Sequence, residues 1–194
     1  MLFIYHYLFA AMWIGFIVYW RVKAANVKAA ERSESVPSRM VRLVLIICAF
    51  LLLALPKVPL PFLNRRFLPM SISISIWSFW IGAAIPACGL LFAVWARHHL
   101  GANWSQEVTL KKDHELITSG PYALVRHPIY TGMLLGLVGS AVAVGEWRGV
   151  LAVALVFGGL WYKLSLEEKW MRSEFGETYE AYCRKVKALV PYVV

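Results

Sequence analysis

The sequence predicts an all-α, polytopic membrane protein with about five transmembrane helices and a C-terminal amphipathic helix. Of its 194 residues, 60% are hydrophobic and only 16% are charged, whereas about a quarter of the residues of a soluble domain are charged. The charged residues also gather between long apolar runs, as they do around membrane spans. We therefore expect one membrane domain over residues 1–194, without a second folded unit.

Three apolar runs make residues 1–95 a predicted three-helix scaffold. A helix rises about 1.5 Å per residue, so about 20 residues cross the hydrocarbon core of a bilayer. The first run, Leu2–Trp20, has that length, and the second, Met40–Leu55, is shorter but strongly apolar. The third run, Ser71–Trp95, begins with alternating Ser and Ile residues, a pattern typical of a strand. Because an isolated strand cannot satisfy its backbone in lipid, we expect a helix there too, bent at Pro86.

Polar segments separate these helices. Residues 21–39 are basic, and their serines together with Pro37 predict a loop in the second half of the segment. Prolines predict another loop over residues 56–69, because proline stops a helix and favours an extended backbone. The longest polar segment, residues 96–125, contains several histidines and aromatic residues. A loop of this length between membrane helices is typical of a functional segment.

A helical hairpin and a charged tail complete the predicted fold. Apolar runs over Ile129–Gly145 and Val150–Leu166 flank a glycine-containing turn. Gly132 and Gly136 have the spacing that lets two helices approach closely, although such pairs also arise by chance in apolar segments. Beyond the hairpin, residues 167–190 carry apolar side chains at three- and four-residue steps, which predicts an amphipathic helix at the membrane surface.

The distribution of Lys and Arg predicts the orientation in the membrane. With five spans, one side receives six of these residues from positions 21–42, four from 97–126 and six from 163–187, and the other side receives the remaining four of the 20. Since basic residues favour the cytoplasmic side, we expect the N-terminus outside and the C-terminus in the cytoplasm. Contact with anionic lipid then explains the net charge of +9, and we expect no nucleic-acid partner.

Ionisable residues that border the apolar helices form four groups: His114-Glu115, Arg126-His127, Lys163 and Glu167-Glu168. Such groups are costly near lipid and are therefore candidates for function. Two structural alternatives remain open. The paired glutamates could begin a solvated helix, and His127 could cap the helix that Pro128 starts. The second alternative explains Pro128 but not the neighbouring Arg126 and Tyr130.

The absence of familiar motifs excludes several classes of protein. No GxGxxG follows a strand, and the sequence contains no P-loop, GxSxG or HExxH, so a Rossmann-type enzyme is unsupported. The three cysteines have no CxxC spacing, so we expect neither a disulfide framework nor a metal site.

One ordered set of motifs resembles a known family. Its members are Gly120-Pro121-Tyr122, Val125-Arg126-His127-Pro128-Ile129-Tyr130-Thr131-Gly132, Glu167-Glu168, Phe175-Gly176-Glu177-x-Tyr179-x-x-Tyr182 and Pro191. In this order they resemble the isoprenylcysteine carboxyl methyltransferase family, whose relatives include phospholipid methyltransferases. The likeness covers about the C-terminal half of the chain.

The resemblance implies a membrane-embedded methyltransferase that uses S-adenosylmethionine, with residues 96–194 as the cofactor-binding half. The distribution of Lys and Arg places the site of this half on the cytoplasmic face. The residues that the resemblance and their chemistry assign to the cofactor are Gln106, His114, Glu115, Leu116, Ile117, Tyr122, His127, Pro128, Ile129, Tyr130, Glu167 and Glu168.

The implied acceptor is a lipid-like or isoprenylated molecule whose tail enters between the helices. The catalytic candidates are Lys163, Glu167 and Arg172. Either cation could hold an acceptor carboxylate, and Glu167 or His127 could take a proton from an amine. Prenylcysteine enzymes of the family carry an arginine where Lys163 stands, and a lysine offers charge without a bidentate fork.

Two other functions remain open on the sequence alone. The first is an NADPH-dependent membrane reductase of the sterol-reductase type, in which Lys111 and Lys112 would have to bind the 2′-phosphate. The second is a non-catalytic membrane scaffold. The sequence also leaves open whether the accepting atom is oxygen, sulfur or nitrogen, and how many copies of the chain associate.

Overall fold

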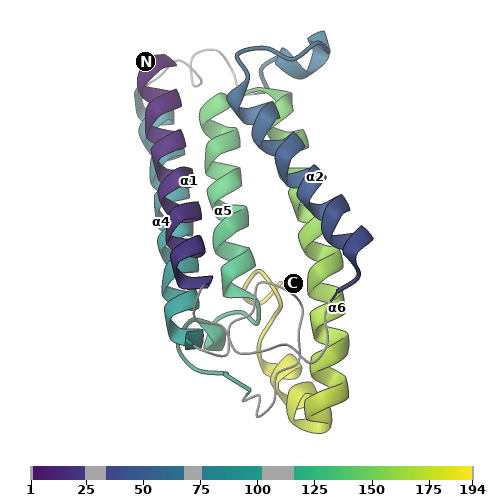
Figure 1. Ribbon diagram of the computed structural model, residues 1–194. Coiled ribbons are helices and arrows are strands. Elements are labelled where there is room, and N and C mark those ends of the chain that lie inside the picture. The colour runs from purple at the N-terminus through teal and green to yellow at the C-terminus, as the bar shows by residue number, and fades with distance from the viewer. Residues whose placement is uncertain (1, 25–33, 68–75, 102–115, 194) are drawn as a thin grey trace.

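A computed structural model describes residues 2–24, 34–67, 76–101 and 116–193. The described residues form helices and no strand, which confirms the all-α prediction. Their α-helices are α1 (Leu2–Ala24), α2 (Val36–Ala54), α4 (Ile76–Leu100), α5 (Pro128–Val144) and α6 (Trp147–Lys185), as Figure 1 shows. Two short 3-10 helices, η1 (Pro61–Asn64) and η3 (Gly120–Ala123), lie in the connections.

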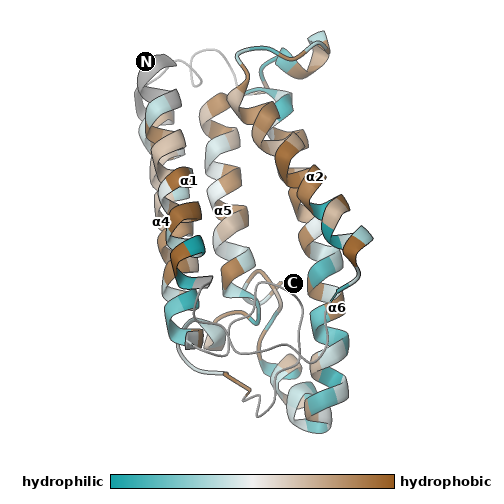
Figure 2. Ribbon diagram, in the orientation of Figure 1, coloured by the Kyte–Doolittle hydropathy of each residue, from teal (hydrophilic) through white to brown (hydrophobic). Residues whose placement is uncertain are grey.

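Several of these helices are long and apolar enough to cross a membrane. Three of the described helices meet this standard: α2, the part of α4 over Phe79–Leu100, and α6. Helix α5 is also apolar but shorter, with 17 residues. Val44, Ile47 and Leu51 of α2 are exposed, and Figure 2 shows hydrophobic residues along α2 and the adjoining part of α6. Because a surface this apolar is unfavourable in water, the chain is a multi-pass integral membrane protein.

Helices α4 and α5 touch backbone to backbone through glycines. A Cβ atom added to Gly89 would lie 2.6 Å from the carbonyl oxygen of Gly132, and one added to Gly132 would lie 2.8 Å from the Cβ of Ala93. A Cβ atom added to Gly136 would lie 3.1 Å from Leu90 of α4 and 3.1 Å from Trp13 of α1. The structure therefore confirms that Gly132 and Gly136 allow a close helix approach.

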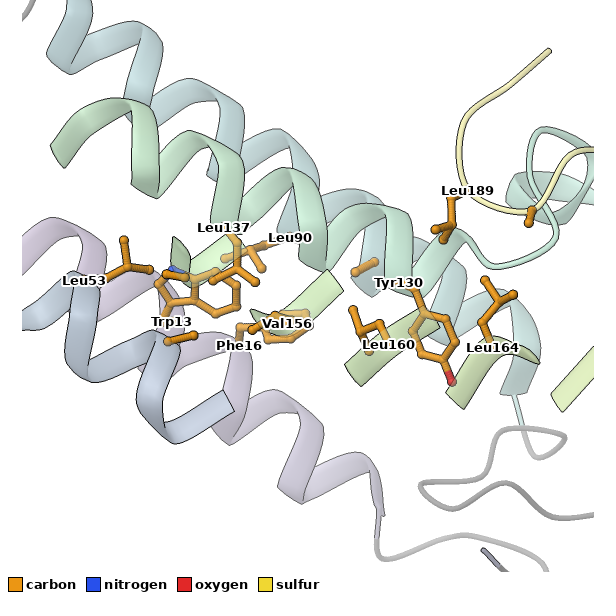
Figure 3. Packing of buried hydrophobic residues seen from close by; sticks show 14 residues of the cluster. Trp13, Phe16, Leu53, Leu90, Tyr130, Leu137, Val156, Leu160, Leu164 and Leu189 are labelled. Atoms are coloured by element: carbon orange, nitrogen blue, oxygen red, sulfur yellow. The ribbon is translucent and has the colours of Figure 1, made fainter. Parts of the chain in front are cut away.

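One hydrophobic core joins the helices. Trp13 of α1 belongs to the same cluster as Leu53 of α2, Leu90 of α4 and Leu137 of α5 (Figure 3). The indole Nε1 of Trp13 donates a hydrogen bond to the Ser140 hydroxyl at 3.1 Å. This bond satisfies the polar edge of a ring that is otherwise surrounded by apolar side chains.

Several predicted boundaries are wrong. Helices α1 and α4 run to Ala24 and Leu100, past the expected ends at Trp20 and Trp95, because their basic last turns remain helical. Helix α2 begins at Val36, because Pro37 fits the first turn of a helix, where its fixed φ is favourable and its missing N–H is not needed. The loop predicted for the second half of residues 21–39 is therefore helical from Val36 onward. Helix α6 does not end at Leu166 but continues to Gly176, whose φ of 49° breaks it. The predicted amphipathic tail is thus the continuation of α6, and the chain folds back at Gly176 (Figure 1).

The turn between α5 and α6 gathers the connections at one end of the bundle. Gly145, with a φ of 68°, caps α5 in the left-handed conformation and reverses the chain as predicted. At this end Arg148 donates hydrogen bonds to the carbonyl oxygens of Leu52 and Leu55, where α2 finishes. The beginning of α5 and the second half of α6 consequently lie together at the opposite end, where the candidate residues are.

Candidate functional site

His127 stands at the entrance to α5 and turns its ring toward α6. Its backbone occupies the N-cap position, but its side chain makes no capping hydrogen bond. The ring nitrogens instead lie 3.4 Å from Glu167 (Nδ1 to Oε2) and 3.4 Å from Glu168 (Nε2 to Oε1). The alternative that His127 serves as a side-chain cap is therefore wrong, and the ring joins both glutamates.

Glu168 is held by arginines on two sides. The Nε and Nη2 atoms of Arg126 donate hydrogen bonds to Oε1 at 2.9 and 2.5 Å, and Arg172 donates to Oε2 at 3.1 Å. Burial opposes ionisation of the Glu168 carboxyl, but the adjacent His127 and the hydrogen-bonded Arg126 lower its pKa to about 2. Glu168 is consequently an ion-paired carboxylate inside the protein rather than the beginning of a solvated helix.

Glu167 is the more open of the two carboxylates. The Tyr130 hydroxyl donates a hydrogen bond to its Oε1 at 2.5 Å, and the Nζ of Lys163 lies 3.8 Å from the same oxygen. The Glu167 side chain keeps 23% of its surface exposed, compared with 9% for Glu168. Burial raises the pKa of Glu167, but the hydrogen bond to His127 and the charge of Lys163 outweigh it and hold that pKa below its usual value. A bound molecule could therefore reach Glu167 as a carboxylate.

The His127 ring is set up to carry a positive charge. Burial opposes that charge, but the adjacent Glu167 and Glu168 carboxylates raise the pKa of His127 above its usual value. The ring also stacks on Tyr130, with ring centres 5.5 Å apart and planes within 5°. The stack fixes the imidazole plane between the two carboxylates.

The segment after α6 closes one side of the cluster. The backbone N–H groups of Arg126 and His127 donate to the carbonyl oxygens of Lys187 and Ala188 at 2.8 and 2.9 Å. The Thr131 hydroxyl donates to the Leu189 carbonyl at 2.7 Å. The loop before α5 and the segment after α6 therefore form one wall, which sequence patterns did not reveal.

The remaining predicted residues fall into three groups. Tyr122 is buried beside the cluster, where burial and the charge of Glu167 raise its pKa. Pro128 is buried in the first turn of α5, and Ile129, Leu116 and Ile117 are half-buried. The predicted cofactor residues outside the described part of the chain are Gln106, His114 and Glu115.

Arg172 is less central than predicted. Its side chain is 44% exposed and pairs with Glu168 and with Glu180, which lies across the break at Gly176. The structure thus joins His127, Tyr130, Lys163 and Glu167 in one cluster and leaves Arg172 on its outer side.

An arginine that the sequence analysis did not single out lies near this cluster. Arg42 of α2 packs on α6 at Gly159, where a Cβ atom would lie 3.4 Å from its Cγ, one helical turn before Lys163. Its Nη1 donates to Glu34 Oε1 at 2.6 Å. The available signal was a charged residue inside an apolar run, which is a candidate for function by default.

Comparisons with known proteins agree on one family. Residues 77–178, more than half of the chain, match the family described as phospholipid methyltransferase. The protein-S-isoprenylcysteine O-methyltransferase of Schizosaccharomyces pombe is 36% identical over 99 residues, which cover 48% of this chain and 41% of that protein. The cobalt-zinc-cadmium resistance protein CzcN of Cupriavidus metallidurans is 33% identical over 115 residues, which cover 58% and 51% of the two chains.

A solved structure shares the fold. The structure of the eukaryotic intramembrane Ras methyltransferase, an isoprenylcysteine carboxyl methyltransferase, matches with a TM-score of 0.55 and 22% identity over 82% of this chain and 54% of that chain. The chain spans about half the length of these relatives. The all-helical membrane architecture is therefore common to both structures.

Proposed function

Because the chain belongs to the phospholipid methyltransferase family, we propose that it is an S-adenosylmethionine-dependent methyltransferase acting on a lipid-like or isoprenylated acceptor at the cytoplasmic membrane face. The observation that carries the proposal is the cluster of His127, Tyr130, Lys163 and Glu167 where α5 and α6 leave their apolar packing. The names of the relatives support the reaction, and the acceptor that we propose has a carboxylate as its accepting group.

The residues of the cluster fit the cofactor. S-adenosylmethionine has an ammonium group, ribose hydroxyls and a planar adenine. The exposed part of Glu167 offers a carboxylate that can bind the ammonium group or the ribose hydroxyls. The adenine could lie against aromatic rings, which Tyr122, His127 and Tyr130 provide. Glu168, already paired with Arg126 and Arg172, would position His127 rather than touch the cofactor.

Methyl transfer requires mainly that the protein align the acceptor with the cofactor. When bound, the cofactor supplies an electrophilic methyl group on a sulfonium. A carboxylate acceptor is already ionised at neutral pH and needs no general base, so alignment and placement of charge are the main contributions of the protein. Lys163 would hold the acceptor carboxylate, while Glu167, which Tyr130 and His127 keep in place, would orient the cofactor.

Ligand-dependent stability tests this proposal. We expect S-adenosylhomocysteine to raise the unfolding temperature of the detergent-purified chain, because a ligand that binds the folded state stabilises it, and NADPH to leave it unchanged. Stabilisation by NADPH instead would indicate a membrane reductase, and stabilisation by neither ligand would leave the methyltransferase proposal without support.

Calorimetry then tests the assigned residues. Glu167→Gln and His127→Ala should each weaken S-adenosylhomocysteine binding by roughly tenfold, the loss expected for one charge-assisted hydrogen bond. Glu180→Gln is the matched control because Glu180 is exposed and lies beyond the break at Gly176. Unchanged affinity in both test variants would remove Glu167 and His127 from the cofactor site.

A further inference from the structure

Glu34 and Arg42 form a buried ion pair at the same end of the bundle as the proposed site. Their side chains are 1% and 14% exposed, and Arg42 Nη1 donates to Glu34 Oε1 at 2.6 Å. The Ser38 hydroxyl donates to the same oxygen. Removing an arginine and a glutamate from water is costly, so a pair in this position calls for a specific role.

The ion pair leaves hydrogen-bonding capacity unused. Among the residues that the structure describes, Arg42 makes its hydrogen bond through Nη1 alone, so Nε and Nη2 remain as donors. The Oε2 atom of Glu34 is buried and has no hydrogen-bond partner within the same residues. A guanidinium edge with two unused donors matches the two oxygens of a carboxylate.

Arg42 lies against the side of α6 that also carries Lys163 and Glu167. Arg42 packs over Gly159, and Lys163 and Glu167 follow at successive turns along the same side of α6. Burial opposes ionisation of Glu34, but hydrogen bonds from Arg42 and Ser38 and the charges of Arg42 and Lys163 lower its pKa. Lys163 is therefore near enough to act on Glu34, and the two cations border one region.

We propose that Arg42 is a specificity-determining residue that binds the acceptor carboxylate together with Lys163, and that Glu34 positions it. This inference rests on the proposed methyltransferase function and deepens it. Lys163 supplies a point charge, and Arg42 supplies the planar fork that a lysine lacks. The acceptor site would then be built from α2 and α6 together, with the membrane-embedded tail of the acceptor beside the apolar part of α2.

The inference predicts that Arg42 discriminates a carboxylate from its neutral analogue. The test uses the full chain in detergent, saturated with S-adenosylhomocysteine, and measures binding of N-acetyl-S-farnesylcysteine and of the same compound as its carboxamide. The unchanged protein should prefer the carboxylate. Arg42→Gln should weaken carboxylate binding by roughly tenfold and leave carboxamide binding unchanged, because it removes charge-assisted hydrogen bonds and not apolar contact. Arg42→Lys should show a smaller loss.

A second variant shows whether an unpaired Glu34, rather than the loss of Arg42 as a ligand, causes the effect. Arg42→Gln alone leaves Glu34 buried without its partner, so the double variant Glu34→Gln/Arg42→Gln removes both charges and should show the same loss of preference. Lys57→Gln is the matched control, because Lys57 is exposed in the connection after α2, at the other end of the bundle.

The outcomes separate this inference from the function on which it rests. If S-adenosylhomocysteine binds the unchanged protein but that protein does not prefer the carboxylate, Arg42 is a structural residue and the inference is overturned. The same conclusion follows if the Arg42 variants weaken both compounds equally. Failure of S-adenosylhomocysteine to bind the unchanged protein would overturn the proposed function itself.

Discussion

Glu167 and Glu168 are neighbours in the sequence with different surroundings. Glu168 is nearly buried and bonds to Arg126 and Arg172, whereas Glu167 remains partly open beside Lys163 and Tyr130. Since consecutive residues of a helix point about 100° apart, one glutamate can stabilise the wall while the other meets a ligand.

Removing the Glu168 charge should destabilise the protein. Glu168→Gln leaves Arg126 buried without its carboxylate, and we expect the free energy of unfolding to fall by roughly 3 kcal/mol. Because the pKa of Glu168 is lowered to about 2 from 4.5, this stabilisation is present above pH 4.5 and lost as pH falls toward 2. Thermal unfolding at neutral pH measures the loss. Glu180→Gln, at an exposed pair, should cost little.

His127 should make stability depend on pH in the opposite sense. Its folded pKa is raised above 6.5, so its contribution is fully present below that pH and is lost as pH rises through the folded pKa. The difference in unfolding temperature between the unchanged protein and His127→Gln should therefore shrink as the pH rises from 6.5 through the folded pKa. His98→Gln, at an exposed position, serves as the control. A difference that stays constant over this range would contradict an ionised His127.

At the scale of helices, the glycines of α4 and α5 set the distance between them. Gly132→Ala should destabilise the protein by about 1–3 kcal/mol, because its Cβ would meet Ala93 and the Gly89 backbone. Gly158→Ala is the control, and it should raise the stability of the protein. Nothing lies within 4 Å of its Cβ position, and alanine favours a helix over glycine by about 1 kcal/mol. Thermal unfolding of both variants distinguishes close packing from a general effect of removing a glycine.

Helices were easier to predict from the sequence than their ends and their partners. Long apolar runs predict α1, α2 and α4 to α6, because a membrane span needs many apolar residues in succession. Pro37 was interpreted as part of a loop although it begins α2, since proline fits both settings. The break at Gly176 depends on a φ of 49°, and a glycine in a sequence permits that angle without requiring it.

The candidate site was predictable only in part. Arg126, His127, Lys163 and Glu167 are ionisable residues beside apolar helices, which makes them candidates from the sequence alone. Tyr130 is a candidate only through the family resemblance. Backbone hydrogen bonds from Arg126 and His127 to the segment after α6 involve no particular side chain, so no sequence pattern predicts them. The Glu34 and Arg42 pair depends on how α2 packs against α6, which hydrophobic periodicity does not determine.

For the whole molecule, the two ends of the bundle differ in charge. Of the 16 Lys and Arg residues that the structure describes, only Lys57, Arg65, Arg66 and Arg148 lie in or beside the connections at one end. The other twelve lie toward the end that holds the proposed site. Because basic residues favour the cytoplasmic side, we propose that the site faces the cytoplasm.

A pair of reporter fusions tests this orientation. A reporter joined to the C-terminus should read as cytoplasmic, and one inserted near Lys57 should read as external, because the described residues Ala188 and Lys57 lie at opposite ends of the bundle. The opposite pair of readings would reverse the orientation and place the proposed site on the external face.

The bonds between the loop before α5 and the segment after α6 also order events during synthesis. Val186 is made 60 residues after Arg126, whose Nη1 donates to its carbonyl oxygen at 2.5 Å. At a translation rate of roughly 5–20 residues per second, several seconds separate the two residues. The nascent chain can therefore insert α5 and most of α6 into the bilayer before His127 and Arg126 receive their backbone partners.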